Sequence, residues 1–264
     1  MLMEYKAGRT TDEVFQKVLG ADPKALDKRF DTYMRLRFAG PLASLGTDSM
    51  AAGLKRAGVN AAQLAEQANA YPANFGLQLL AGTAMLEASD TGSAIVLLER
   101  AHTLFPDDGA ADGPNGLLAH VYLARGDNRK AANALTTIVT HNESEFGAAV
   151  ALARVLEQLG DKARAADALD RAMYINPFDI AMHQHLADLY QGLGDKARVV
   201  RERRAIVALV PVDRADALYR LALAWHDAGD DKQARTSVLR ALEEAPNFAP
   251  AQDLLLLIVD ARKP

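Results

Sequence analysis

A repeating pattern of large and small apolar residues runs through the central and C-terminal parts of the chain. Pairs of a leucine followed by an alanine recur at Leu118-Ala119, Leu152-Ala153, Leu186-Ala187 and Leu221-Ala222. A bulky side chain follows three residues after each alanine, at Tyr122, Leu156, Tyr190 and Trp225. Side chains three and four apart share one face of a helix, so each segment predicts a helix with one packing face. The alanine lets another helix approach closely, while the bulky neighbours fill the space beside it.

Turn signals divide this pattern at an almost constant spacing. Gly-Asp pairs are 34, 34 and 35 residues apart, at Gly126-Asp127, Gly160-Asp161, Gly194-Asp195 and Gly229-Asp230. Prolines follow with the same period, at Pro177, Pro211 and Pro246. Glycine suits the left-handed residue that ends a helix, aspartate caps the next helix, and proline cannot continue a helix. Each period therefore predicts two helices joined by a tight turn.

The period, the paired helices and the small–large pattern resemble the tetratricopeptide repeat. The expected repeats are residues 75–108, 112–145, 146–179, 180–214 and 215–248. The first of these departs from the pattern at its turn, where Ala88-Ser89-Asp90-Thr91 replaces Gly-Asp. The resemblance implies an all-α fold, a right-handed α-solenoid of about five helix-turn-helix repeats. Residues 249–264 are expected to form a capping helix over the last apolar face.

Residues 1–72 predict a helical N-terminal extension that includes a degenerate repeat. Thr11-Asp12-Glu13 predicts a capped helix start, with acidic side chains near the positive end of the helix. Asp22-Pro23 predicts a second helix that runs to about Phe38 and is broken by Gly40-Pro41. Residues 60–72 resemble the second helix of a degenerate repeat.

Part of this extension is similar to a known enzyme tail. The stretch from Tyr5 to Phe38, with Leu19-Gly20 and Leu26-Asp27 within it, resembles the helical C-terminal end of zinc metallopeptidases of the peptidase MA-like (gluzincin) type. The resemblance implies that the chain is the C-terminal accessory region of a larger enzyme whose catalytic domain lies upstream. The alternative is that these helices only cap the solenoid.

Composition narrows the class of protein further. Of 264 residues, 50% are hydrophobic and 6% aromatic, which is globular rather than disordered or fibrous. The formal net charge of −4 excludes a general nucleic-acid binder, and the lack of cysteine excludes a disulfide scaffold. We expect no membrane span, because apolar runs such as residues 254–259 are far shorter than the roughly 20 residues that a span needs. We also expect no secretory signal, because the N-terminus has no basic segment followed by an apolar core. The sequence leaves two cellular compartments as alternatives: the cytoplasm, or an extracytoplasmic compartment if the chain is a piece of an exported protein.

The sequence contains no recognisable motif for catalysis, cofactor binding or metal binding. The histidines lack the His-Glu-x-x-His spacing of metallopeptidases. His183 and His185 are two residues apart, so on a helix their side chains point about 200° apart and cannot share one metal ion. The acidic loop Asp107-Asp108-Gly109 lacks the ligand pattern of an EF-hand. We expect no enzyme activity, no cofactor and no metal site within these residues.

Partner binding is the function that the repeats favour. The first helices of stacked repeats line the concave face of a solenoid. Counting from the packing residues places these side chains on that face: Thr83, His120, Arg154, Gln158, Gln184, Asp188, Gln191, Tyr219 and His226. They suit an extended peptide or a partner helix, so we expect a non-catalytic scaffold that binds a protein or peptide in the groove. A clamp for chaperone C-termini is disfavoured, because only Arg154 could supply the charge it needs.

Two further features leave alternatives open. A basic cluster, expected on the outer face and partly paired with Asp195, Glu202 and Asp213, consists of Lys196, Arg198, Arg201, Arg203 and Arg204. This cluster is either a solvated surface or a patch for an acidic partner. Self-assembly is another interpretation, in which the end helix at 250–262 or the N-terminal segment pairs with another copy to form a homo-oligomer.

Overall fold

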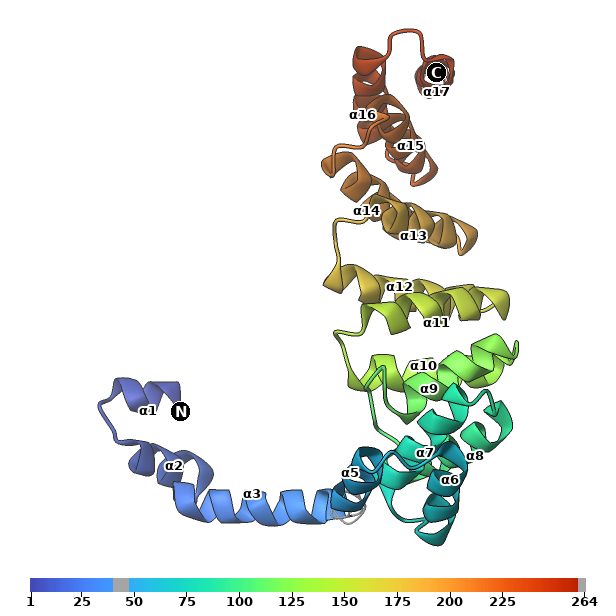
Figure 1. Cartoon of the computed structure of the whole chain (residues 1–264). Coiled ribbons are helices and arrows are strands. Elements are labelled where there is room, and N and C mark those ends of the chain that lie inside the picture. The colour runs from blue at the N-terminus through green and yellow to red at the C-terminus, as the bar shows by residue number, and fades with distance from the viewer. Residues whose placement is uncertain (40–47, 261–264) are drawn as a thin grey trace. The chain divides into compact units, whose positions relative to one another are not determined.

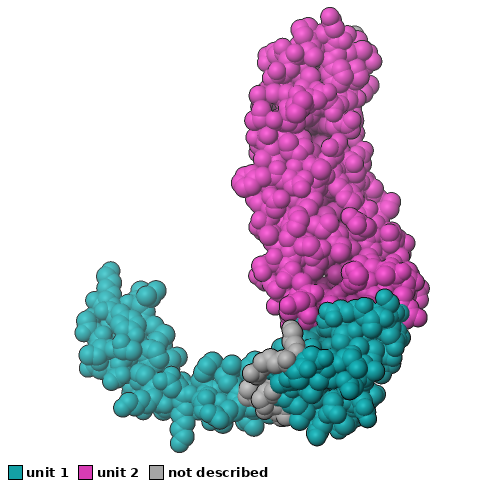
Figure 2. Space-filling model, in the orientation of Figure 1, with its two compact units in different colours: residues 1–108 teal, residues 109–264 magenta. Residues whose placement is uncertain are grey.

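The computed structural model describes residues 1–39 and 48–260, and every regular element in these ranges is a helix. The chain divides into two compact units, residues 1–108 and 109–264, coloured separately in Figure 2. The break predicted at Gly40-Pro41 and the last residues of the predicted capping segment, 261–264, lie outside the described residues. The all-α prediction is confirmed.

The helices of unit 1 are labelled in Figure 1. They are α1 (Leu2–Lys6), α2 (Thr11–Leu19), α3 (Pro23–Arg37), α5 (Asp48–Arg56), α6 (Ala61–Ala70), α7 (Phe75–Glu87) and α8 (Thr91–Leu104). Both predicted N-terminal helix starts are present. Thr10 and Glu13 form a capping box at α2, and Asp22 caps α3 with Pro23 at its first turn.

The core of unit 1 lies among α5, α6, α7 and α8. Leu64 and Ala68 of α6 pack with Leu77 and Ala81 of α7. Gly82 lies at a close approach of α7 to α8, since a Cβ atom there would lie 2.8 Å from the Leu98 side chain. By contrast, α3 buries no side chain, and Phe30 on its predicted apolar stripe is 63% exposed.

Unit 2 consists of successive helix hairpins followed by a final helix (Figure 1). Its helices are α9 (Pro114–Ala124), α10 (Asn128–His141), α11 (Phe146–Gln158), α12 (Lys162–Ile175), α13 (Ile180–Gly192), α14 (Lys196–Ala208), α15 (Arg214–Asp227), α16 (Asp231–Glu244) and α17 (Ala249–Asp260). The second helix of each hairpin packs against the first helix of the next, and α17 packs against α15 and α16.

The turns within the hairpins follow the predicted chemistry. Each glycine of the four Gly-Asp pairs has a positive φ, between 73° and 84°. Each aspartate caps the following helix, accepting a hydrogen bond from the backbone N–H three residues later. The divergent turn between α7 and α8 has the same geometry: Ser89 takes the left-handed conformation with φ 62°, and Asp90 caps α8. The hairpin α7–α8 therefore keeps the same turn geometry with a serine in place of the glycine.

Small residues form the helix crossings of unit 2. The alanines of the Leu-Ala pairs are all buried, and so are the alanines or valine five residues after each glycine: Ala131, Ala165, Val199 and Ala234. At the C-terminal end, Ala251, Leu254 and Ile258 of α17 cover an apolar surface formed with Leu218 and Val238. The opposite side of α17 leaves Leu256 and Leu257 exposed.

Candidate partner-binding site

A cavity lies between the hairpin α13–α14 and the following helix α15. Its volume is about 360 Å³, and we call it the α13–α15 cavity. It is lined by Gln191, Gly194, Lys196, Val199, Arg203, Arg220, Leu223, Ala224 and Asp227. A second, smaller cavity of about 140 Å³ continues past Gln184 and Asp213. Arg203 and Arg220 line both cavities, so the two arginines lie where one cavity meets the other.

Arg203 is a buried cation at this site, with only 5% of its surface exposed. Its Nη2 donates to Asp188 Oδ1 at 2.6 Å, which ties α14 to the first helix of the same hairpin. Its Nη1 is buried and has no hydrogen-bond partner among the described residues. A buried donor without a partner costs about 1–3 kcal/mol.

The other charged groups of the α13–α15 cavity are more exposed. Arg220 donates from Nε to Asp216 at 2.5 Å, and this hydrogen bond raises the pKa of Arg220. Lys196 and Asp227 line the cavity from its two sides without an ion pair to any described residue. The cavity therefore offers three cations and one unpaired carboxylate next to the aliphatic side chain of Leu223.

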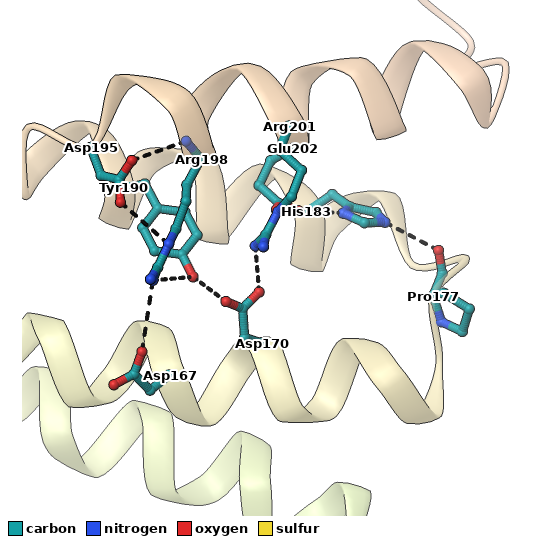
Figure 3. Close-up of polar contacts among 9 residues, drawn as sticks. All are labelled: Asp167, Asp170, Pro177, His183, Tyr190, Asp195, Arg198, Arg201 and Glu202. Carbon is teal, nitrogen blue, oxygen red and sulfur yellow. Dashed lines mark hydrogen bonds and ion pairs between the residues drawn. The ribbon is translucent and has the colours of Figure 1, made fainter.

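A polar network joins the second helices α12 and α14 on another side of the same hairpin (Figure 3). The Tyr190 hydroxyl donates a short hydrogen bond to Asp170, and Arg201 Nη2 reaches the same carboxylate at 2.5 Å. Burial raises the pKa of Tyr190 to about 12, and the hydrogen bond to Asp170 acts in the same direction. The guanidinium of Arg198 lies 5.1 Å from the Tyr190 ring centre, a cation–π distance.

His183 and Glu202 form a buried pair beside this network (Figure 3). His183 Nδ1 lies 2.6 Å from Glu202 Oε2, and its Nε2 lies 3.1 Å from the Pro177 carbonyl oxygen. His185 instead points to Glu157 of α11, at 3.0 Å. The two histidines thus serve different helix–helix contacts.

The basic cluster departs from prediction at Arg203 and in the role of Asp213. Arg198 and Arg201 are exposed and paired with acidic side chains, as expected for an outer face. Arg203 is buried and paired with Asp188 on the first helix, so its placement on the outer face is wrong. Asp213 caps α15 by accepting from the Asp216 backbone N–H, rather than pairing with the cluster.

The structure brings three of the predicted groove residues together. Gln184, Asp188 and Gln191 lie along one side of α13: Gln191 lines the α13–α15 cavity, Gln184 lines the smaller cavity, and Asp188 holds Arg203 between them. All three are exposed, as binding residues on a first helix need to be.

The remaining predicted residues lie apart from these cavities. On α9 and α11, His120 and Arg154 are exposed, and Gln158 accepts a hydrogen bond from Asn128. Thr83, in unit 1, donates to the Leu79 carbonyl of its own helix.

Two predicted residues of α15 face the end of the chain instead. Tyr219 packs edge-on against Phe248, with ring centres 5.4 Å apart, and His226 Nδ1 lies 2.7 Å from Asp231. The side of α15 that faces the α13–α15 cavity carries Arg220, Leu223 and Asp227.

Sequence reasoning missed Arg203, although the repeat register contains a signal for it. Arg203 is nine residues after Gly194, and the residues nine after the other three glycines are buried and aliphatic: Leu135, Leu169 and Val238. The position one residue earlier is also exceptional, since Glu202 stands where two other hairpins have Ala134 and Ala168. Reading each helix by repeat position would have shown charged residues at core positions of one repeat only.

The described residues contain neither a metal-binding cluster nor a membrane-spanning helix. Within residues 1–39 and 48–260, no group of three or more histidine, aspartate or glutamate side chains could hold a metal ion. Over the same ranges, no helix is both long and apolar enough to cross a membrane.

Comparison with known proteins identifies the repeat. The family profile described as tetratricopeptide repeat matches residues 117–180, and a second profile of the same description matches residues 216–247. These two segments of the chain are therefore similar to tetratricopeptide repeats. Both matches lie outside residues 1–38, so the resemblance of that segment to a peptidase tail stays a prediction. A comparison with curated proteins finds no match.

Several solved structures are similar at low identity. MamA protein is 20% identical, with 64% of this chain and 90% of that chain covered and a TM-score of 0.41. YrrB, described as a TPR protein with an unusual peptide-binding site, is 16% identical, with coverage of 67% and 89% and a TM-score of 0.43. TTC0263, a thermophilic TPR protein of Thermus thermophilus, is 21% identical, with coverage of 69% and 97% and a TM-score of 0.34.

Proposed function

We propose that this protein is a non-catalytic scaffold that binds an extended segment of a partner protein along the first helices of unit 2. The observation that carries the proposal is the α13–α15 cavity, which opens beside exposed polar side chains of α13. Tetratricopeptide repeats bury their packing residues between helices, so side chains such as Gln184 and Gln191 contribute little to the core and are available to a partner.

The shape and lining of the site favour a peptide segment over a small metabolite. The two cavities follow one another along α13 and α15, and each is small. An extended segment can place successive side chains into such a row while its backbone lies over the exposed polar residues. Arg154 is exposed on the first helix α11 and makes no ion pair with the described residues, so we expect it to contact the same partner segment beyond the two cavities.

Selection of short random peptides displayed on phage against the full chain tests the proposal. Selected peptides should bind more weakly to the double variant Arg154→Glu with Gln184→Ala, because both side chains lie on first helices. The matched control is Arg235→Glu with Gln233→Ala, the same chemical changes on exposed positions of the second helix α16. Failure to select any peptide, or equal losses in the two double variants, would contradict binding at this surface.

A further inference from the structure

Arg203 is an arginine at a position that the other hairpins of unit 2 give to an aliphatic residue. The hairpins with Leu135, Leu169 and Val238 show that this position needs no charge for folding. Arg203 also leaves its Nη1 group buried and unpartnered among the described residues. A buried guanidinium that lacks a hydrogen-bond partner on one nitrogen and lies beside a cavity is suited to bind an acceptor group that enters the cavity.

The groups around Arg203 define which acceptor fits. Lys196 and Arg220 add positive charge to the lining of the α13–α15 cavity, so the acceptor is an anion. Three carboxylates also surround the site: Asp188 on Arg203, Asp216 on Arg220, and Asp227 in the lining. The three carboxylates balance the three cations, so the second charge of a phosphate gains no net attraction at this site, and a singly charged carboxylate suits the one free donor of Arg203.

The size of the cavity sets a second limit. A volume of about 360 Å³ lies near the lower end of ligand-binding cavities, which are about 300–1,000 Å³. It accommodates one acidic side chain together with the aliphatic contact offered by Leu223, and it does not accommodate a folded element.

We propose that the α13–α15 cavity binds the carboxylate of one aspartate or glutamate side chain within an extended partner segment, with Arg203 as the principal binding residue. The carboxylate enters between α13 and α15 and accepts from the guanidinium of Arg203, while Lys196 and Arg220 add attraction from the rim. This inference rests on the proposed function and names the chemistry that the groove recognises.

The test uses the full chain and the peptides selected on phage. Each acidic residue of a selected peptide is changed in turn, Asp→Asn or Glu→Gln, and dissociation constants are measured by fluorescence anisotropy with wild type, Arg203→Leu and Arg204→Leu. Arg204 is exposed on the same helix, so its variant controls for the loss of one positive charge. Arg203→Met repeats the measurement with a second apolar side chain of similar length.

One acidic peptide residue should lose about tenfold or more in affinity for the wild type when amidated, as expected for a charge-assisted hydrogen bond. The same change should have little effect with Arg203→Leu, which itself binds the unmodified peptide about tenfold or more weakly. Selected peptides that show no such coupling to Arg203 overturn this inference and leave the scaffold function intact. Failure to select any peptide overturns both.

Discussion

Arg203 donates to Asp188 at 2.6 Å from within the hairpin α13–α14, yet the acceptor carboxylate is 62% exposed while the guanidinium is buried. The pair is therefore unequal: Asp188 remains hydrated, and only Arg203 loses its contact with water. Most of the desolvation cost of the pair therefore falls on Arg203. A substitution at Arg203 can remove its proposed role in binding without lowering the stability of the fold.

Replacing Arg203 with leucine should leave the free energy of unfolding unchanged or increase it by about 1–3 kcal/mol, because the change removes a buried donor without a partner while Asp188 stays hydrated. Leu169, at the same position of the preceding hairpin, shows that the site can hold such a side chain. Urea denaturation followed by circular dichroism measures the change, with Arg204→Leu expected within about 0.5 kcal/mol of wild type. A marked loss of stability in Arg203→Leu would make the arginine structural.

Ser89→Gly should stabilise unit 1 by about 0.5–1 kcal/mol, because a residue with a Cβ atom is strained at φ 62°. The reciprocal change, Gly160→Ser, places a side chain at φ 80° in unit 2 and should destabilise by about 1 kcal/mol. Thermal unfolding of both variants gives the two shifts. Shifts of the same sign would refute the equivalence of the two turns.

Ala187→Leu should cost about 1–3 kcal/mol, since Ala187 is fully buried at a helix crossing where a larger side chain cannot fit. On the same helix, Gln191→Leu should change stability by less than about 0.5 kcal/mol, because Gln191 is exposed at the cavity. Denaturant midpoints compare the two leucine variants directly. Equal costs would place Gln191 in the core.

Tyr190→Phe should destabilise by about 1–2 kcal/mol near neutral pH, through loss of the hydrogen bond to Asp170. Because folding raises the pKa of Tyr190 to about 12, from an ordinary value of 10, the neutral hydroxyl contributes its full stability below about pH 10. That contribution is lost as the pH rises toward 12. The stability difference between wild type and variant should therefore shrink between pH 10 and pH 12.

Tyr174→Phe is the matched control for this pH dependence, because Tyr174 is 89% exposed. Its stability difference from wild type should stay near zero over the same range. An equal decline in both comparisons would assign the effect to general alkaline unfolding.

Much of the fold was predictable because the same local chemistry recurs in every hairpin. Glycine stops, aspartate caps and Leu-Ala packing pairs each act within a few residues, so the sequence specifies them locally. The candidate site was less predictable. The position of Tyr219 against Phe248 depends on how α17 packs on α15, and the burial of Arg203 depends on three helices at once. Charge suggested that Arg203 is on the surface, but its repeat position decides otherwise.

The one 35-residue spacing between Gly-Asp pairs has a structural counterpart at Val210, which takes a left-handed conformation with φ 54° between α14 and α15. A residue added inside a helix would rotate everything after it by about 100° and expose its packing face. Here α14 ends at Ala208 and α15 begins at Arg214, so the extra residue of this spacing is accommodated at the loop between the two hairpins. A change of one residue at this junction leaves the register of α14 and α15 intact, so residues 209–213 are where the spacing between two hairpins can vary without exposing a packing face.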